Sequence, residues 1–230
     1  MNSTIYSTKN HRYFANARDD MLAFIPTGVR RILEIGCGTG EFGAAIKRRG
    51  DVEIVGVELV ESAAARARYH LDQVITADIQ CQNIDMPAQS FDCLVCNDVL
   101  EHLVDPWSVL ARLRHFVKPD GWLVASIPNV RHHKVVRRLL WPGEWRYEDK
   151  GVLDRTHLRF FTRASARALV EGAGFAIERE EGIHRSDFPL WLKAINAVMG
   201  ETFDDMRYLQ FVIVARSVKL AEKQIQQNGP

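Results

Sequence analysis

Residues 33–40 read Leu-Glu-Ile-Gly-Cys-Gly-Thr-Gly, and this stretch decides the fold. An apolar run around Ile32 precedes it, and a helix-like segment from Phe42 to Arg48 follows it. Glycine lets the backbone adopt positive φ and lets a ligand approach the main chain closely. A helix N-terminus offers free N–H groups and a partial positive charge. The stretch therefore predicts a strand, a tight loop and a helix that together bind a nucleotide-like ligand.

Two sets of glycines compete within this stretch. The first set, Gly36, Gly38 and Gly40, forms G-x-G-x-G directly at the end of the strand. The second set replaces Gly36 by Gly43 and forms the dinucleotide fingerprint G-x-G-x-x-G. However, Glu41 would place a negative charge at the helix start, where a pyrophosphate has to lie. The neighbours therefore favour a cofactor without phosphates, and an NAD-dependent oxidoreductase is the alternative that the second set supports.

An acidic residue beside the glycines narrows the choice of ligand. Glu34 lies two residues before Gly36 and favours a ligand that is cationic or zwitterionic. With this acid, residues 34–40 resemble the first motif of class I S-adenosylmethionine-dependent methyltransferases. Three later segments match the same family in order, and the matches together cover about residues 30–127. The resemblance implies that S-adenosylmethionine is the cofactor.

Each later segment places a polar residue near the end of a predicted strand. Glu58 lies 22 residues after Gly36, close to the spacing of roughly 20 that is typical of a ribose-binding acid. Asp78 resembles the acid near the adenine amino group, and Asn97 with Asp98 resembles the strand end over the methionine part. The implied cofactor-binding residues are Glu34, Gly36, Cys37, Gly38, Gly40, Glu58, Leu59, Asp78, Ile79, Asn97 and Asp98.

Strand-like and helix-like segments alternate from residue 30 to residue 127. This alternation predicts an α/β fold with a parallel sheet and helices on both faces. The resemblance implies a Rossmann-like sheet of seven mostly parallel strands, whose last strand is antiparallel and inserts between the fifth and the sixth. Ligands of such sheets bind at the carboxyl ends of the strands, where the candidate residues would meet.

The 230 residues are expected to form a single methyltransferase domain, residues 1–230, around one core. Residues 1–28 are expected to form an N-terminal helical cap and residues 217–230 a flexible tail. Two insertions, residues 128–160 and 183–206, would follow the fifth and sixth strands and act as lids over the substrate. Thr162 is expected to cap the helix between them.

The composition argues against several classes of protein. No apolar run approaches the roughly 18 residues that span a bilayer, and residues 1–13 lack the apolar stretch of a secretory signal. Cys93 and Cys96 lie in an apolar strand pattern and are expected to be buried thiols, not a zinc or redox pair. The expected compartment is the reducing cytoplasm.

Charge is nearly balanced overall but not locally. The net charge of +1 gives no general attraction to nucleic acid. Residues 131–163 carry nine Lys or Arg against four Asp or Glu, a surplus of five positive charges. This surplus is either a solvated face or a rim that attracts an anionic small-molecule acceptor.

Asp98, Glu101 and His102 would lie on one face of a helix, at positions i, i+3 and i+4. Such side chains bind Mg²⁺, Mn²⁺ or Zn²⁺. The segment resembles the E-x-x-E-H of metal-dependent ubiquinone-biosynthesis O-methyltransferases and small-RNA 2′-O-methyltransferases, with Asp98 in place of the first glutamate. The alternative is a histidine that packs on the cofactor without a metal. Asp98 and His102 are therefore candidates for catalysis as well as for a metal site.

His157 lies in a second candidate segment, Asp154 to Thr162, which resembles a segment of bacterial sugar, polysaccharide and natural-product methyltransferases. A histidine near neutral pH could take the proton of a hydroxyl group, or it could be a structural residue that holds the lid. The candidates for acceptor binding are His132, His133, Trp145 and Arg155; rings in a lid are as often its own small core.

The combined prediction is O-methylation of a hydroxylated small molecule such as a sugar, a nucleotide sugar or a glycan precursor. A phenol or quinone O-methyltransferase and an N-methyltransferase are the alternatives, followed by an RNA 2′-O-methyltransferase and the NAD-dependent oxidoreductase. The apolar segment 188–203 could be the surface of a homodimer or a pocket wall.

Overall fold

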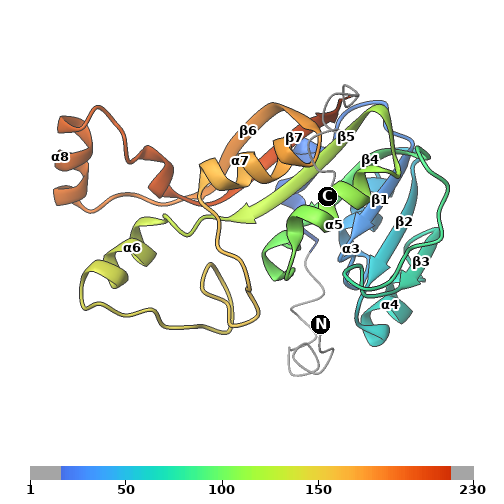
Figure 1. The fold of residues 1–230 in the computed structure, drawn as a ribbon, viewed down its shortest axis with the longest axis horizontal. Helices are drawn as coiled ribbons and strands as arrows, with labels where there is room; N and C mark the ends of the chain where they lie inside the picture. The colour runs from blue at the N-terminus through green and yellow to red at the C-terminus, as the bar shows by residue number, and fades with distance from the viewer. Residues whose placement is uncertain (1–16, 219–230) are drawn as a thin grey trace, which may run out of the picture.

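The computed structural model describes residues 17–218, which form one seven-stranded sheet with helices on both faces (Figure 1). The strands are β1 (Arg31–Ile35), β2 (Glu53–Glu58), β3 (Gln73–Thr76), β4 (Phe91–Asn97), β5 (Val117–Pro128), β6 (Phe175–Arg185) and β7 (Tyr208–Ser217). Their order is β3-β2-β1-β4-β5-β7-β6. Only β7 runs antiparallel to its neighbours, β5 and β6. The predicted Rossmann-like sheet with an inserted antiparallel strand is therefore confirmed.

The helices fall into two layers and two projecting segments. They are α3 (Glu41–Lys47), α4 (Glu61–Ala67), α5 (Pro106–Arg114), α6 (His133–Leu140), α7 (Arg163–Gly172) and α8 (Leu190–Val198), with short 3₁₀ helices η1 (Asp19–Phe24), η2 (Leu100–His102) and η3 (Asp204–Arg207). Helices α3 and α4 pack with η1 on one face of the sheet, whereas α5 and α7 cover the other. In Figure 1, α6 and α8 extend from the far end of the sheet.

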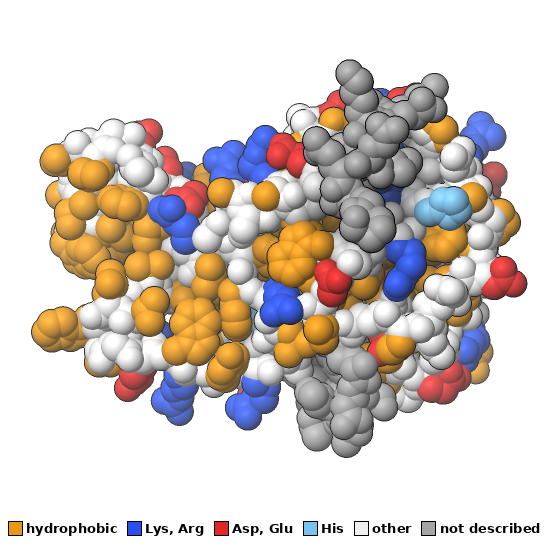
Figure 2. Space-filling model, viewed as in Figure 1, with side chains coloured by type: hydrophobic (Ala, Val, Ile, Leu, Met, Phe, Trp, Pro, Cys, Tyr) orange, Lys and Arg blue, Asp and Glu red, His pale blue; other side chains and the backbone are white. Residues whose placement is uncertain are grey.

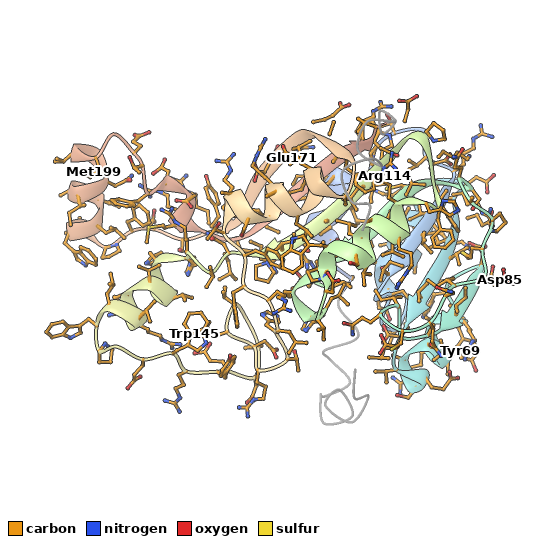
Figure 3. All side chains as sticks on the ribbon, viewed as in Figure 1. Tyr69, Asp85, Arg114, Trp145, Glu171 and Met199 are labelled. Atoms are coloured by element: carbon orange, nitrogen blue, oxygen red, sulfur yellow. The ribbon has the colours of Figure 1, made fainter. Side chains whose placement is uncertain are left out.

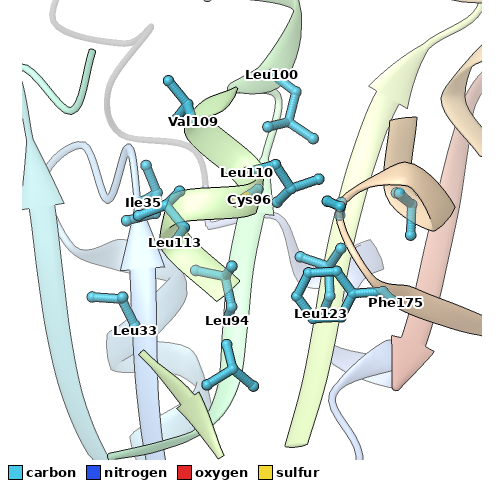
Figure 4. Close-up of a cluster of buried hydrophobic side chains, with 14 of the residues drawn as sticks. Leu33, Ile35, Leu94, Cys96, Leu100, Val109, Leu110, Leu113, Leu123 and Phe175 are labelled. Atoms are coloured by element: carbon cyan, nitrogen blue, oxygen red, sulfur yellow. The ribbon is translucent and has the colours of Figure 1, made fainter. Parts of the chain in front are cut away.

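Alternating side chains of the strands pack into hydrophobic clusters on the two faces of the sheet. Leu33 and Ile35 of β1 belong to the core cluster under α5 and α7, and Ile32 belongs to the cluster under α3. Figure 4 shows the first cluster, in which Leu110 and Leu113 of α5 lie over the strands. Buried apolar residues on both faces are typical of a parallel sheet between two helical layers.

Local capping fixes where helices α5 and α7 begin. The Asp105 carboxylate accepts a hydrogen bond from the Ser108 backbone N–H at 3.1 Å, and Pro106 occupies the first turn of α5. Thr162 and Ser165 form a reciprocal capping box at the start of α7, which confirms the predicted cap.

Several predicted boundaries differ from the structure. The described part of the N-terminal cap is only the 3₁₀ helix η1, and residues 1–16 lie outside the described residues. The predicted tail began at residue 217, but Ser217 belongs to β7. Residues 219–230 of that tail also lie outside the described residues. The sixth strand continues to Arg185 because it pairs with β7 as far as Tyr208. Within residues 17–218, no helix is both long and apolar enough to cross a membrane.

Candidate active site

A cavity of about 500 Å³ opens at the carboxyl ends of β1, β2 and β4. Ten of the eleven predicted cofactor-binding residues line it, namely Glu34, Gly36, Cys37, Gly38, Glu58, Leu59, Asp78, Ile79, Asn97 and Asp98. Gly36 has a φ of 68°, and a Cβ atom there would lie 2.7 Å from the Val99 Cγ2 atom. Only glycine therefore leaves the first turn of the loop open.

The eleventh residue, Gly40, supports helix packing. It precedes α3 with a φ of 84°, and a Cβ atom there would lie 3.1 Å from the Ala67 Cα atom of α4. Gly43 lies inside α3, where a Cβ atom would collide with Leu71 and lie 3.0 Å from the Glu34 Oε2 atom. Neither Gly40 nor Gly43 lines the cavity. Their match to the dinucleotide spacing therefore reflects close packing around helix α3 and not ligand binding.

Glu58 holds the glycine loop against the end of β2. Its Oε2 atom accepts the Gly38 N–H and its Oε1 atom accepts the Val60 N–H, both at 2.9 Å. Burial raises the pKa of Glu58, and the two backbone donors oppose that rise. The carboxylate is thus fixed at the cavity wall, where a ligand with adjacent hydroxyl groups could reach it.

Glu34 is a buried carboxyl group with one unsatisfied hydrogen-bonding oxygen. Its Oε2 atom has no hydrogen-bond partner in the protein, and the residue is 4% exposed. Burial, followed by the neighbouring Glu58 charge, raises the pKa of Glu34 to about 8. A cationic group in the cavity would therefore favour the ionised form of this residue.

Asn97 ends β4 and lines the same cavity. Neither the nitrogen nor the oxygen of its amide has a hydrogen-bond partner in the protein, although both atoms are buried. A buried amide without partners is costly unless a ligand or water satisfies it. Asn97 is therefore placed to bind a polar ligand.

Asp98 takes part in a network that the sequence did not reveal. It has a φ of 53°, and its carboxylate forms an ion pair with Arg18. It also accepts hydrogen bonds from Ser126 at 3.0 Å and from Gln210 at 2.8 Å. Arg18 is 8% exposed and lines the cavity. The sequence could not predict this, because an isolated arginine before the first strand belongs to no recognisable motif.

The predicted helical face of Asp98, Glu101 and His102 does not form. Residues 100–102 make a single 3₁₀ turn, and Asp98 lies outside it. The structure instead groups Glu101 and His102 with His157, and their ligand atoms lie within 4.8 Å of one another. His157 therefore replaces Asp98 as the third candidate ligand, because the fold brings it next to this turn, and the metal site itself stays a prediction.

Backbone hydrogen bonds bring His157 to the cavity. The Glu101 carbonyl accepts the N–H groups of Leu158 and Arg159 at 2.8 and 2.9 Å. The His102 Nδ1 atom lies 3.1 Å from the Thr156 carbonyl oxygen. These contacts attach residues 156–159 to η2 and hold the rings of His102 and His157 edge to face, with centroids 4.7 Å apart.

The chemistry of this cluster follows from its hydrogen bonds. A carbonyl oxygen only accepts, so the Nδ1 atom of His102 must donate to Thr156, and the Nδ1 atom of His157 must donate to Val152 at 2.9 Å. The Nε2 atom of each neutral ring then carries the lone pair, as in metal-binding and basic histidines.

Glu101 completes the cluster as a buried acid. It is 1% exposed, and neither carboxylate oxygen has a hydrogen-bond partner in the protein. Burial, followed by the Asp98 charge, raises the pKa of Glu101 well above its ordinary value. The Oε1 atom lies 3.9 Å from the His157 Nε2 atom. Two histidine nitrogens and one orphaned carboxylate form a donor set that fits a divalent cation.

The predicted acceptor-binding residues do not line the cavity. His132 and His133 are buried, and each Nε2 atom lies within 2.9 Å of the Ser186 Oγ atom. Burial lowers the pKa of His132 to about 4, so this pair joins the two insertions as neutral rings.

Trp145 and Arg155 also lie away from the cavity. Trp145 packs edge to face on Phe160 with centroids 4.9 Å apart, and Figure 3 shows it on the projecting segment. Arg155 is exposed and pairs with Asp149 at 2.9 Å. The first insertion instead contributes Pro128, residues 150–152, Asp154 and His157 to the cavity wall, and the second insertion contributes none. The lid role of the two insertions stays a prediction, and only residues of the first insertion line the cavity.

Comparisons with known proteins identify the family of this chain. A family model described as a methyltransferase domain matches residues 6–180. A Neisseria meningitidis serogroup C protein named ubiquinone biosynthesis O-methyltransferase is 27% identical over 162 residues, or 67% of each chain. The protein of that name from Paracidovorax citrulli is 34% identical over 110 residues, or 45% of this chain and 46% of the other. This chain thus matches between about half and two thirds of the length of these relatives.

The fold has solved counterparts. An S-adenosylmethionine-dependent methyltransferase from Mesorhizobium loti matches with a TM-score of 0.61 at 22% identity, covering 87% of this chain and 98% of that chain. The family model covers well over half of the 230 residues. The chain therefore belongs to the methyltransferase-domain family, and its resemblance to class I S-adenosylmethionine-dependent methyltransferases is confirmed.

Proposed function

We propose that the protein transfers the methyl group of S-adenosylmethionine to a hydroxyl oxygen of a small-molecule acceptor. The observation that carries this proposal is the buried cluster of Glu101, His102 and His157 in the wall of the cavity. A hydroxyl must lose its proton to become a good nucleophile, and such a cluster can accept that proton. An amine acceptor would need less assistance.

The charged residues of the cavity fit the cofactor as a zwitterion with a sulfonium. Glu34 offers negative charge to the cationic groups, and the guanidinium of Arg18 offers positive charge to the carboxylate. Glu58 and Asp78 line the part of the cavity next to β2 and the loop after β3, where the ribose and the adenine would bind.

Methyl transfer follows from this placement. When bound, S-adenosylmethionine would supply an electrophilic methyl group to the acceptor oxygen, and Arg18, Glu34 and Asn97 would hold it in the cavity. The proton of the acceptor hydroxyl passes to the Nε2 atom of His157. His157 is oriented for this step by its hydrogen bond to the Val152 carbonyl.

As an alternative to proton transfer to His157, we propose that Glu101, His102 and His157 hold a divalent cation, which would bind the same His157 Nε2 atom. When bound, the cation would lower the pKa of a hydroxyl group beside it. Two imidazoles favour Mn²⁺, Fe²⁺ or Zn²⁺ over Mg²⁺, which prefers oxygen ligands. Metal analysis of the purified protein should find about one ion per chain, and Glu101→Gln should lose it. Full activity and no bound metal in the presence of chelator would contradict this proposal.

For the acceptor, we favour a phenolic hydroxyl. Val99, Leu103, Pro128, Val152 and Leu209 give the cavity an apolar wall. The relatives named ubiquinone biosynthesis O-methyltransferase support the same class. Of the residues that favoured a sugar, Trp145 and Arg155 lie outside the cavity, whereas Asp154 and His157 line it. Lys150 also lines the cavity and would suit an anionic nucleotide sugar.

The test has two stages. Isothermal titration should show binding of S-adenosylhomocysteine and no binding of NAD⁺. Labelled methyl transfer from S-adenosylmethionine should then be measured with a panel of catechols, monophenols, nucleotide sugars and aryl amines. We expect transfer to catechols. Transfer to aryl amines alone would contradict the proposal, and transfer to nucleotide sugars alone would overturn the phenolic acceptor.

A further inference from the structure

A hydrogen-bonded group at the cavity edge joins four side chains that lie far apart in the sequence. Arg18 precedes η1, Asp98 follows β4, Ser126 lies in β5 and Gln210 lies in β7. Arg18, Asp98 and Gln210 line the cavity, and Ser126 is fully buried. The projecting end of the molecule, where Figure 2 shows apolar side chains gathered over α6 and α8, contributes no residue to this group.

Gln210 contacts both charged members of the group. Its Nε2 atom donates to the Asp98 Oδ1 atom at 2.8 Å, and its Oε1 atom accepts from the Arg18 Nη2 atom at 3.3 Å. The reverse orientation of the amide would place N–H against N–H and oxygen against oxygen, so the two partners fix its orientation. One side chain of β7 thus sets the separation between a cation and an anion of the cavity wall.

Ser126 supports the same two residues from β5. Its Oγ atom donates to the Asp98 Oδ1 atom at 3.0 Å and accepts the Asp98 backbone N–H at 3.1 Å. It also accepts from the Arg18 Nη1 atom at 3.3 Å. One donor and two acceptor sites are the full capacity of a hydroxyl group. Asp20 in turn accepts from the Nε and Nη2 atoms of Arg18, at 3.1 and 3.2 Å.

The backbone of Arg18 and Asp98 explains why these residues need such support. Their φ angles are 44° and 53°, in the left-handed region that residues other than glycine rarely adopt. Residues in this region persist where the surrounding contacts over-determine them, and they cluster at ligand sites. Next to Asp98, the buried amide of Asn97 has no hydrogen-bond partner in the protein, which points to a polar ligand at this place.

The place of the group in the sheet indicates which part of the cofactor it serves. In the strand order, β2 with Glu58 lies on one side of β1, whereas β4, β5 and β7 lie on the other. The ribose is expected at Glu58, so the far side is left for the other end of the cofactor. A cation and an anion held side by side suit a ligand group with one charge of each sign. The amino-acid end of S-adenosylmethionine, with its ammonium and carboxylate, is such a group.

We propose that Gln210 is a positioning residue for the amino-acid end of the cofactor, and that it acts by holding Arg18 and Asp98 in the cavity wall. The inference rests on the proposed function, because it takes S-adenosylmethionine as the cofactor. Ser126 shares this role. Gln210 is the better residue to vary, because it is only half-buried.

The experiment is isothermal titration of the full chain with S-adenosylhomocysteine and with 5′-methylthioadenosine. The second ligand keeps the adenosine and the sulfur but lacks the amino-acid end. Gln210→Ala should weaken binding of S-adenosylhomocysteine about tenfold or more, because it removes hydrogen bonds to two charged groups and loosens both. The same variant should leave binding of 5′-methylthioadenosine within about twofold of the wild type, since the adenosine lies elsewhere in the cavity.

Two further variants control for a general effect on the fold. Gln210→Glu keeps the size of the side chain but places a second carboxylate beside Asp98, so it should also weaken S-adenosylhomocysteine selectively. Gln73→Ala is the matched control, because Gln73 is exposed on β3 and lies outside the cavity. It should bind both ligands as the wild type does. Binding of 5′-methylthioadenosine by each variant reports that its site is folded.

The outcomes separate this inference from the proposed function. Equal loss of affinity for both ligands would overturn the inference, because Gln210 would then support only the fold. Unchanged binding of S-adenosylhomocysteine with a raised KM for the acceptor would also overturn it, because Gln210 would then belong to the acceptor side. Both results leave the proposed methyl transfer untouched. If the wild type binds neither ligand, the proposed function fails and the inference fails with it.

Discussion

Replacing Glu34 by Gln should change how the stability of the protein depends on pH. Glu34 is 4% exposed, and burial with the Glu58 charge raises its pKa from 4.5 to about 8. Between these values the folded chain holds a proton that the unfolded chain has released. Stability therefore falls as pH rises from about 4.5 to 8. The variant lacks this titration.

The size of the effect follows from the pKa shift. One proton of difference changes the free energy of unfolding by about 1.36 kcal/mol for each pH unit. Partial ionisation of the unfolded chain at pH 5 reduces the full two-unit value slightly. The wild type should therefore lose about 2.5 kcal/mol more stability than Glu34→Gln between pH 5 and pH 7.

Urea unfolding of the protein without cofactor, followed by circular dichroism at pH 5, 6 and 7, measures this difference. Glu53→Gln is the control, because it removes the same charge from β2 at a position that is 47% exposed and paired with Arg31. The control should keep the pH dependence of the wild type. If Glu34→Gln also keeps it, the carboxyl of Glu34 is not held neutral by burial.

The same residue links stability to cofactor binding. A sulfonium and an ammonium in the cavity would favour ionised Glu34, so binding of S-adenosylmethionine at pH 7 should release close to one proton. Titration calorimetry in buffers of different ionisation enthalpy measures that proton. Glu34→Gln should release none and should bind the cofactor more weakly.

Three further variants test the site and its supports. His157→Ala should lower turnover by about 10²–10⁴ with cofactor affinity unchanged, as measured by kinetics and titration; an effect below about threefold would argue against a base. Gly40→Ala should reduce the free energy of unfolding by about 1–3 kcal/mol because of its positive φ and its contact with α4, whereas Gly50→Ala, in open space, should change it little. Ser186→Ala should reduce the free energy of unfolding by about 1–3 kcal/mol, because it removes the hydrogen-bond partner of His132 and His133. Turnover per folded molecule should stay within about twofold of the wild type, because Ser186 lies outside the cavity. A large loss of turnover would restore these histidines as acceptor-binding candidates.

The sequence determined the sheet and most of the residues that line the cavity at its edge. Apolar strands, glycine at positions of positive φ and acids at strand ends are local features, and parallel strands bring their carboxyl ends to one edge. Local pattern together with the resemblance to class I methyltransferases was therefore enough to assign Glu34, Gly36, Glu58 and Asn97 to one cavity. The capping box at Thr162 is local in the same sense.

Tertiary structure alone decided which distant side chains meet. Arg18 reaches Asp98 across 80 residues, and His157 joins Glu101 across 56, so neither pairing has a sequence period. Conversely, His132 and Trp145 have suitable chemistry but face Ser186 and Phe160. Periodicity fixes which face of an element is apolar, whereas the path of a loop depends on the backbone and side-chain contacts available where it lands. For this reason the sequence predicted well which residues at the strand ends line the cavity, and poorly which residues of the insertions do.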